Sequence, residues 1–195
     1  MFSPGFPVGA FAYSHGLEQA FAGGTIASAA DLEAWITDLL DHGAGRSDAI
    51  LLLAEMTGDA NSLARALPAS AERLTETLLQ GAALASTAAA LWGTDGAAAP
   101  YPIAAGRIAA ALDLPPDMTV RFYLHAFAAN LVSAAVRAVP LGQTEGQRVL
   151  SDLHPLIERI AGEVTGDLDT VSSTCFASDI AAMRHETLEP RIFRT

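Results

Sequence analysis

The spacing of apolar residues along the chain predicts helices almost throughout. The clearest amphipathic helix lies between Ser28, placed as its N-cap, and Gly43, placed to stop it. Its apolar residues recur at i, i+3, i+4, i+7 and i+8, and they are Leu32, Trp35, Ile36, Leu39 and Leu40. This spacing puts all of them on one face, which indicates a helix that packs against a core.

The same reading predicts the other elements. We expect helices from a cap at Ser14 to the Gly23-Gly24 pair, from Ser47 through Met56, from Ser70 to Trp92, from Ile103 to Leu112, from Asp117 to Val139, from Gly146 to Val164, and over Phe176 to Met183. Pro155 must kink or restart its helix at His154. Alternating strands with tight turns are missing from the sequence, so the fold class is all-α, with residues 1–195 forming one domain of about eight or nine helices.

The segment from Asp117 to Val139 differs from the other helices because it is apolar nearly all round. Such a helix needs cover on every side, which indicates the centre of a bundle or a subunit interface. We therefore predict a homodimer whose interface includes this helix, with the Trp35 helix as the second choice. His125, Asn130 and Arg137 interrupt the segment, and each is costly in a bilayer, so we do not expect a membrane span.

Composition narrows the function classes. The chain has 195 residues, of which 51% are hydrophobic, and 22 acidic residues against 11 basic ones give a net charge of −11. Every basic residue is arginine. The missing lysine excludes P-loop and Schiff-base chemistry, and the acidic balance disfavours nucleic-acid binding. Cys175 is the one cysteine and cannot form an internal disulfide, so we expect a reducing, cytoplasmic location.

Histidines, the cysteine and neighbouring acidic residues are candidate metal ligands or catalytic groups. His15 and Glu18 stand at i, i+3, which would let both face one metal, whereas His42 follows Asp41 as a solvated helix end. His125 fits a hydrogen-bonded core or interface position, and His154 fits the kink before Pro155. A sulfur-rich site of Cys175, Asp179 and Met183 is conceivable, but such residues most often fill core space. We expect no catalytic residue, resident metal or cofactor, and a metal-dependent helical enzyme using His15, Glu18 and His42 remains the alternative.

The two ends of the chain are richer in chemistry than its alanine-rich middle. Residues 2–13 form a loop with several aromatic residues, two glycines and two prolines, which predicts extended, ordered backbone. The tail, about residues 186–195, combines Arg191 and Arg194 with Phe193, and arginine and aromatic residues are enriched at protein–protein hot spots. We expect the tail to be poorly ordered alone and to become fixed on a partner. Truncating Phe193 or Arg194 to alanine should then weaken docking by at least ~1 kcal/mol and leave the fold intact.

Four blocks of sequence resemble one family. Phe6–Glu18 (FPVGAFAYSHGLE) closely resembles the opening motif of the UreF family of urease accessory proteins. Gly43–Leu53 and Pro140–Gln147 (PLGQTEGQ) are similar to its middle blocks, and Asp179–Thr187 followed by Arg191–Thr195 is similar to its C-terminal signature. Family members usually carry further residues before the Ser3-Pro4 element, so we expect the natural chain to start upstream. Thr195 stands where the family generally has serine, which keeps the hydroxyl.

The resemblance implies a non-enzymatic, all-α homodimer that docks with UreD, also called UreH. That platform recruits the GTPase UreG, and the complex delivers nickel to apo-urease. The candidate partner-contact residues implied by the family pattern are Tyr13, Ser14, His15, Glu18, Arg184, His185, Glu186, Arg191, Phe193 and Arg194. An alternative role in the same complex is regulation of UreG GTP hydrolysis, in which a tail arginine acts as an arginine finger.

Overall fold

The computed structural model describes residues 1–3, 5–139 and 141–195, and these contain ten α-helices, two 3-10 helices and no strand. Pro4 of the opening loop and Pro140 of the third sequence block lie outside the described residues. In chain order the elements are η1 (Ala10–Ala12), α1 (Leu17–Ala22), α2 (Ala29–His42), α3 (Ala44–Thr57), α4 (Asn61–Ala66), α5 (Ala71–Trp92), α6 (Tyr101–Ala111), α7 (Pro116–Ala138), α8 (Gln143–Asp152), α9 (His154–Glu163), η2 (Leu168–Thr170) and α10 (Phe176–His185). The all-α, single-domain bundle predicted from the sequence is confirmed.

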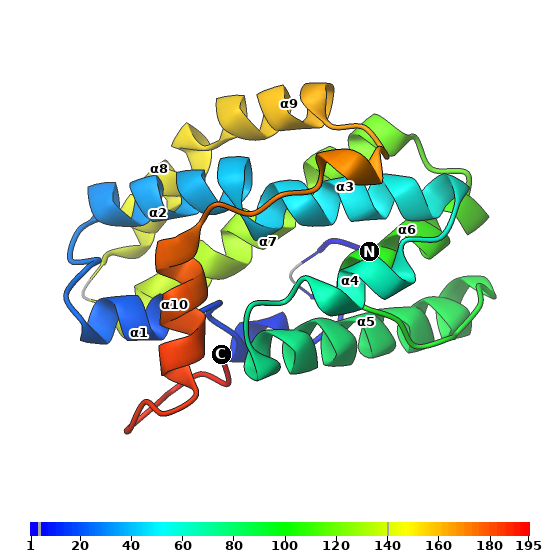
Figure 1. The fold of residues 1–195 in the computed structure, drawn as a ribbon. Helices are drawn as coiled ribbons and strands as arrows, with labels where there is room; N and C mark the ends of the chain where they lie inside the picture. Colours follow the sequence, from blue (N-terminus) through cyan, green and yellow to red (C-terminus); the bar gives the residue numbers. More distant parts are fainter. Residues whose placement is uncertain (4, 140) are drawn as a thin grey trace.

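Helix α7 is the centre of the bundle. It packs against α1, α2, α3, α8 and α9, while α6 is held between α3 and α5 on the other side (Figure 1). Val120, Leu124, Leu131 and Ala135 of α7 are all buried in one continuous core. The cover that this apolar helix requires therefore comes mainly from its own chain, and Met118 and Phe122, near its N-terminal end, are the large apolar side chains of α7 left exposed among the described residues.

The helix ends agree with the sequence in some places and differ in others. Ser28 caps α2 in a capping box, in which the Ser28 side chain accepts from the Asp31 backbone and the Asp31 side chain accepts from the Ser28 backbone. Ser70 caps α5 as expected. The expected caps at Ser14, Ser47 and Asp117 are wrong, because α1 starts after Gly16, α3 after Gly43 and α7 after Pro115. In each case a glycine or proline sets the turn into the helix and leaves the polar residue one or more positions inside or outside it.

Pro155 acts as predicted. Helix α8 ends at Asp152 and α9 begins at His154, so the proline occupies the first turn of a new helix, where its missing N–H costs nothing. None of the helices in the described ranges is long and apolar enough to span a membrane.

Helix α10 returns the chain to its beginning. It lies against α1 and also contacts the start of α5, so the C-terminal residues end beside η1 and α5 (Figure 1). The tail thereby lies beside residues 12–18, whereas Figure 1 shows the N-terminus farther along the bundle, between α3 and α4.

Candidate partner-docking site

Helices α1 and α10 approach each other closely at Gly16. Gly16 has φ +79°, and a Cβ atom there would lie 2.7 Å from the backbone nitrogen of Ala182. Only glycine fits both the left-handed backbone and the close contact. On the other side of this contact, Ala181 and Ala182 present the small buried face of α10.

The tail runs beside the opening loop and is held there by backbone hydrogen bonds. The Ser14 N–H donates to the main-chain oxygen of Thr195 at 3.0 Å, and the Arg194 N–H donates to the Ala12 oxygen at 2.8 Å. The Ser14 hydroxyl also donates to the same Thr195 oxygen. Ser14 and Thr195 are both buried, so these bonds are shielded from water.

Glu18 of α1 fastens the next part of the tail. Its carboxylate accepts from the backbone N–H groups of Ile192, at 2.5 Å, and of Phe193, at 2.8 Å. The same carboxylate lies 3.1 Å from Nε2 of His185. Because Glu18 is buried, a charge at this position requires these donors.

His185 connects α10 to α5 through two carboxylates. Its Nδ1 lies 2.7 Å from Glu72, its Nε2 faces Glu18, and its side chain is fully buried. The ring is thus held between two carboxylates, one at each nitrogen. Arg191 forms a second ion pair with Glu72 at 2.5 Å, and Glu186 accepts from the Ala71 N–H at 2.8 Å, which caps α5 from the tail side.

A second buried charged group lies under the Thr195 end of the tail, centred on Glu76 of α5. Glu76 accepts from the Thr195 hydroxyl at 2.8 Å, lies 2.9 Å from Nε2 of His15 and pairs with Arg73. Burial alone would raise the pKa of Glu76, but Arg73 and His15 beside it lower this pKa to about 2. Burial, reinforced by Arg73, lowers the pKa of His15.

Phe193 anchors the tail in the apolar interior. Its side chain is only 3% exposed, and the Arg137 guanidinium lies 4.8 Å from the ring centroid in a cation–π contact. The tail is packed on its own chain, unlike the poorly ordered tail that its composition predicts. That the fold survives the loss of the Phe193 side chain stays a prediction. Two buried carboxylates and a buried aromatic ring fix the segment on its own chain before any partner is present.

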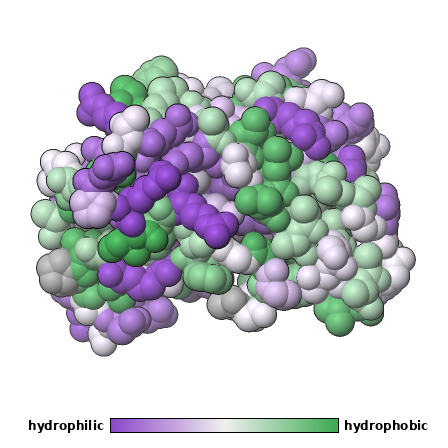
Figure 2. All heavy atoms as spheres, turned by 90° about the horizontal axis from the view of Figure 1, so that it is seen from below, coloured by the Kyte–Doolittle hydropathy of each residue, from purple (hydrophilic) through white to green (hydrophobic). Residues whose placement is uncertain are grey.

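The predicted contact residues divide into two groups. Those that are buried or largely buried hold the tail in place, and they are Tyr13, Ser14, His15, Glu18, His185 and Phe193. Those that are exposed can meet a partner directly, and they are Arg184, Glu186, Arg191 and Arg194. Viewed from below, hydrophilic residues gather on the half of this face where α10 and the tail lie, with a small hydrophobic patch among them (Figure 2).

Helix α10 also presents large apolar side chains to solvent. Phe176, Ile180 and Met183 stand at i, i+4 and i+7 and are 68%, 46% and 50% exposed. Near the tail, Phe11 and Ile192 are exposed as well. At this spacing the three side chains lie on one face of α10.

Comparison with known proteins shows the family. The family model for UreF matches residues 26–154. The urease accessory protein UreF of Cereibacter sphaeroides (strain KD131) is 57% identical over 198 residues, which cover 99% of this chain and 94% of that protein. Those of Roseobacter denitrificans and Ruegeria pomeroyi are 53% and 49% identical, and the matches cover 99% and 100% of this chain and 90% and 93% of the relatives. This chain belongs to the UreF family. It is therefore an accessory protein of urease maturation.

The structure separates the residues of the alternative enzyme reading. His15 contacts Glu76 and Arg73, and Glu18 contacts the tail. His42 is exposed at the end of α2, beside Asp41. The described ranges hold no group of three or more His, Cys, Asp or Glu side chains placed to bind a metal. Cys175 donates from Sγ to the Asp38 oxygen at 3.0 Å, and burial raises the pKa of its thiol to about 11, which marks an inert thiol.

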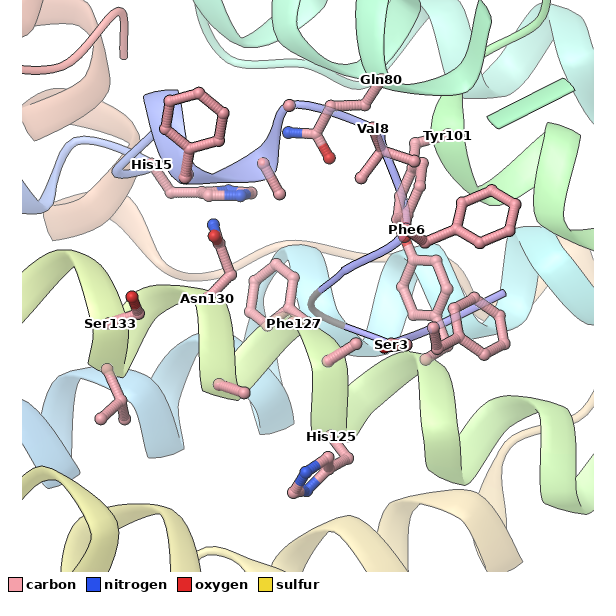
Figure 3. A pocket seen from close by; sticks show the side chains of 18 of the residues that line it. Ser3, Phe6, Val8, His15, Gln80, Tyr101, His125, Phe127, Asn130 and Ser133 are labelled. Carbon is pink, nitrogen blue, oxygen red and sulfur yellow. The ribbon is translucent and has the colours of Figure 1, made fainter. Parts of the chain in front are cut away.

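A cavity of about 850 Å³ lies beside this site, between the opening loop, α5 and α7 (Figure 3). Phe6, Phe127 and Tyr101 line it together with the polar groups of Asp48 and Asn130. The Tyr123 hydroxyl donates to Asp48 at 2.7 Å, and burial raises the pKa of Asp48 to about 6. The loop thus roofs a space that contains a carboxyl group able to change protonation near neutral pH.

Sequence reasoning missed the acidic half of this site. Glu72 and Glu76 follow the Ser70 cap on successive turns of one helix face, and both receive tail contacts. Two acidic residues on the buried face of a helix indicate that cationic groups lie close to them, and this pattern was present in the sequence. Arg191 of the tail pairs with Glu72, whereas Glu76 pairs with Arg73 of its own helix and accepts from the Thr195 hydroxyl.

Proposed function

We propose that this UreF-family protein is a non-catalytic urease maturation factor that docks with UreD (UreH) and recruits the GTPase UreG to deliver nickel to apo-urease. One observation carries the docking surface: the exposed apolar face of α10, defined by Phe176, Ile180 and Met183, on the helix that packs against α1 and the start of α5.

The opposite face of α10 explains why these side chains are free. Ala181, Ala182 and His185 are buried against α1 and α5, so rotating the helix to bury Ile180 would expose His185 and break its two carboxylate contacts. The helix is therefore locked with its large apolar side chains outward. Covering them with a partner removes apolar surface from water at no cost in internal packing.

The rim of this surface is polar. Arg184 and Glu186 flank the end of α10, and Arg194 is exposed on the ordered tail. An apolar centre with an arginine-containing rim is the usual anatomy of a protein–protein interface. The buried tail residues act in this account as positioning groups that hold α10 and the rim in one arrangement.

Co-expression with UreD, followed by pull-down and a urease assay with UreG and the urease subunits, tests the proposal. Ile180→Asp puts a charge in the centre of the surface and should abolish UreD capture and urease activation. Leu91→Asp is the matched control, because Leu91 is 62% exposed at the far end of α5. Equal UreD capture by both variants would remove α10 from the interface.

The homodimer remains part of the proposal, with a smaller role for α7 than the sequence suggested. The exposed part of α7, Met118 and Phe122, is the surface that a second copy would cover. Sedimentation at micromolar concentration should show a dimer that Phe122→Asp dissociates, and a monomeric wild-type chain would contradict this part.

Regulation of UreG is the second candidate, and the ordered tail favours it. An arginine finger must be held in fixed geometry, and the Arg194 backbone is bonded to Ala12 while its guanidinium makes no ion pair with another described residue. Arg148, which is exposed on α8, supplies the control. Single-turnover GTP hydrolysis by UreG should then be accelerated by the wild-type chain and by Arg148→Ala, but not by Arg194→Ala. Equal rates with all three would leave only the docking role.

A further inference from the structure

Two histidines from separate helices face each other outside the docking site. His125 lies in the middle of α7, His154 opens α9, and Nδ1 of His125 is 3.3 Å from Nε2 of His154. His125 is one of the residues that line the cavity, and Figure 3 shows its side chain apart from the other labelled side chains. His125 is half-buried and His154 is exposed, so one side of the pair is open to solvent.

Two imidazole nitrogens that face each other can share one proton or one metal ion. With Zn–N bonds of about 2.0–2.1 Å, nitrogens 3.3 Å apart subtend about 105–110° at the metal, which is the tetrahedral angle. An octahedral ion with cis ligands at 90° would need about 2.9 Å at the same bond length. We propose that His125 and His154 form a two-histidine site for a tetrahedral divalent ion of the Zn²⁺ class, with water completing the coordination.

The surroundings keep both imidazoles available. Burial and the neighbouring His154 lower the pKa of His125. Arg121, one turn before His125, pairs with Glu158, one turn after His154. Glu158 is thus engaged by an arginine, and the pair remains a site with two protein ligands, in accord with the lack of any three-ligand group in the described ranges.

The position of the pair gives a metal ion a structural effect. Helices α7 and α9 pack against each other, and an ion bound by one residue from each would cross-link them. The chain carries a net charge of −11, which favours cation binding over the whole surface and makes a position-specific control necessary. The site is independent of the docking proposal, because neither histidine contacts α10 or the tail.

Zinc titration of the full chain at pH 7.5, by calorimetry or against a chromophoric chelator, tests the site. The wild-type chain should bind one Zn²⁺. Since loss of a group that merely orients a metal ligand costs about 10–100-fold in affinity, loss of a ligand itself in His125→Gln or His154→Gln should cost at least about tenfold. His42→Gln is the control, because His42 is exposed and lies apart from the pair. Unchanged affinity in His154→Gln, or equal loss in the control, would overturn the proposal.

Cobalt provides a readout of geometry. Co²⁺ in the wild-type chain should give the intense visible absorption of a tetrahedral ion, and His154→Gln should lose it. Zinc should also raise the Tm of the wild-type chain but not that of His154→Gln, whose exposed side chain is not needed for folding. A weak octahedral cobalt spectrum, or the same zinc-induced Tm shift in both chains, would contradict a site formed by this pair.

Discussion

The effect of Phe193→Ala on stability distinguishes a tail that is packed on the fold from a tail that is solvated. A buried phenylalanine removes about 150–250 Å² from water, which contributes about 4–6 kcal/mol at about 25 cal/mol per Å². Phe193 is 3% exposed, so nearly all of this area is lost in the variant, together with the Arg137 contact worth about 0.5–1 kcal/mol. Because a chain end can detach without unfolding the core, we expect the global free energy of unfolding to fall by about 2–3 kcal/mol.

The assay is urea denaturation followed by far-UV circular dichroism, with a thermal scan alongside. For a chain of this length the expected loss corresponds to a Tm decrease of about 4–12 °C. Ile192→Ala is the matched control. The Ile192 side chain is next to Phe193 in the sequence but is 74% exposed, so its removal should change stability by less than about 0.5 kcal/mol. Equal stability of the two variants would refute the argument that the tail is part of the fold.

Three further predictions concern the groups around the tail and the cavity. Gly16→Ala should lower the free energy of unfolding by about 3 kcal/mol or more, because the backbone is strained and the new Cβ clashes with Ala182. Gly24→Ala is the control: its φ is +72° but the space around it is open, so it should cost about 1–2 kcal/mol in the same denaturation assay. Equal losses in the two variants would contradict the close α1–α10 contact. Glu76→Gln should lower the free energy of unfolding by about 3–5 kcal/mol at pH 7. The stabilisation by the wild-type carboxylate is lost as pH falls from about 4.5 toward 2, so the difference in stability between the two chains should shrink over that range. A difference that does not change with pH would contradict this prediction. Burial raises the pKa of Asp48 to about 6, so the folded chain holds a proton there that the unfolded chain releases at lower pH. The contribution of Asp48 to stability should therefore fall as pH rises from about 4 to 6, and Asp48→Asn should lack this dependence. A pH profile of stability that is the same in both chains would place Asp48 in water.

The sequence predicted the elements that depend on neighbouring residues. The period of Leu32, Ile36 and Leu39, the Ser28 capping box and the restart at Pro155 are local features, and the structure has each of them where expected. Caps at Ser14 and Ser47 failed because a nearby glycine set the start of the helix instead. The competing signals lie within a few residues of each other, and tertiary packing decides between them.

The site depended on contacts that spacing cannot show. The tail is fixed by Glu18 and Glu72, which are more than a hundred residues away in the chain, so its order could not be predicted from its own composition. In α10 the spacing of Phe176, Ile180 and Met183 predicted a helix correctly but not which face is buried. The face with Ala181 and Ala182 is buried because close packing against Gly16 needs small side chains.

Hydrogen exchange with and without UreD tests the central claim, which is that α10 and the ordered tail form the docking surface. The free chain should already protect the amides of Ile192 and Phe193, which donate to Glu18. Adding UreD should increase protection in peptides that cover residues 176–195 and leave the C-terminal end of α5 around Leu91 unchanged. Protection confined to α5, or no change over 176–195 in a complex shown to have formed, would contradict the account.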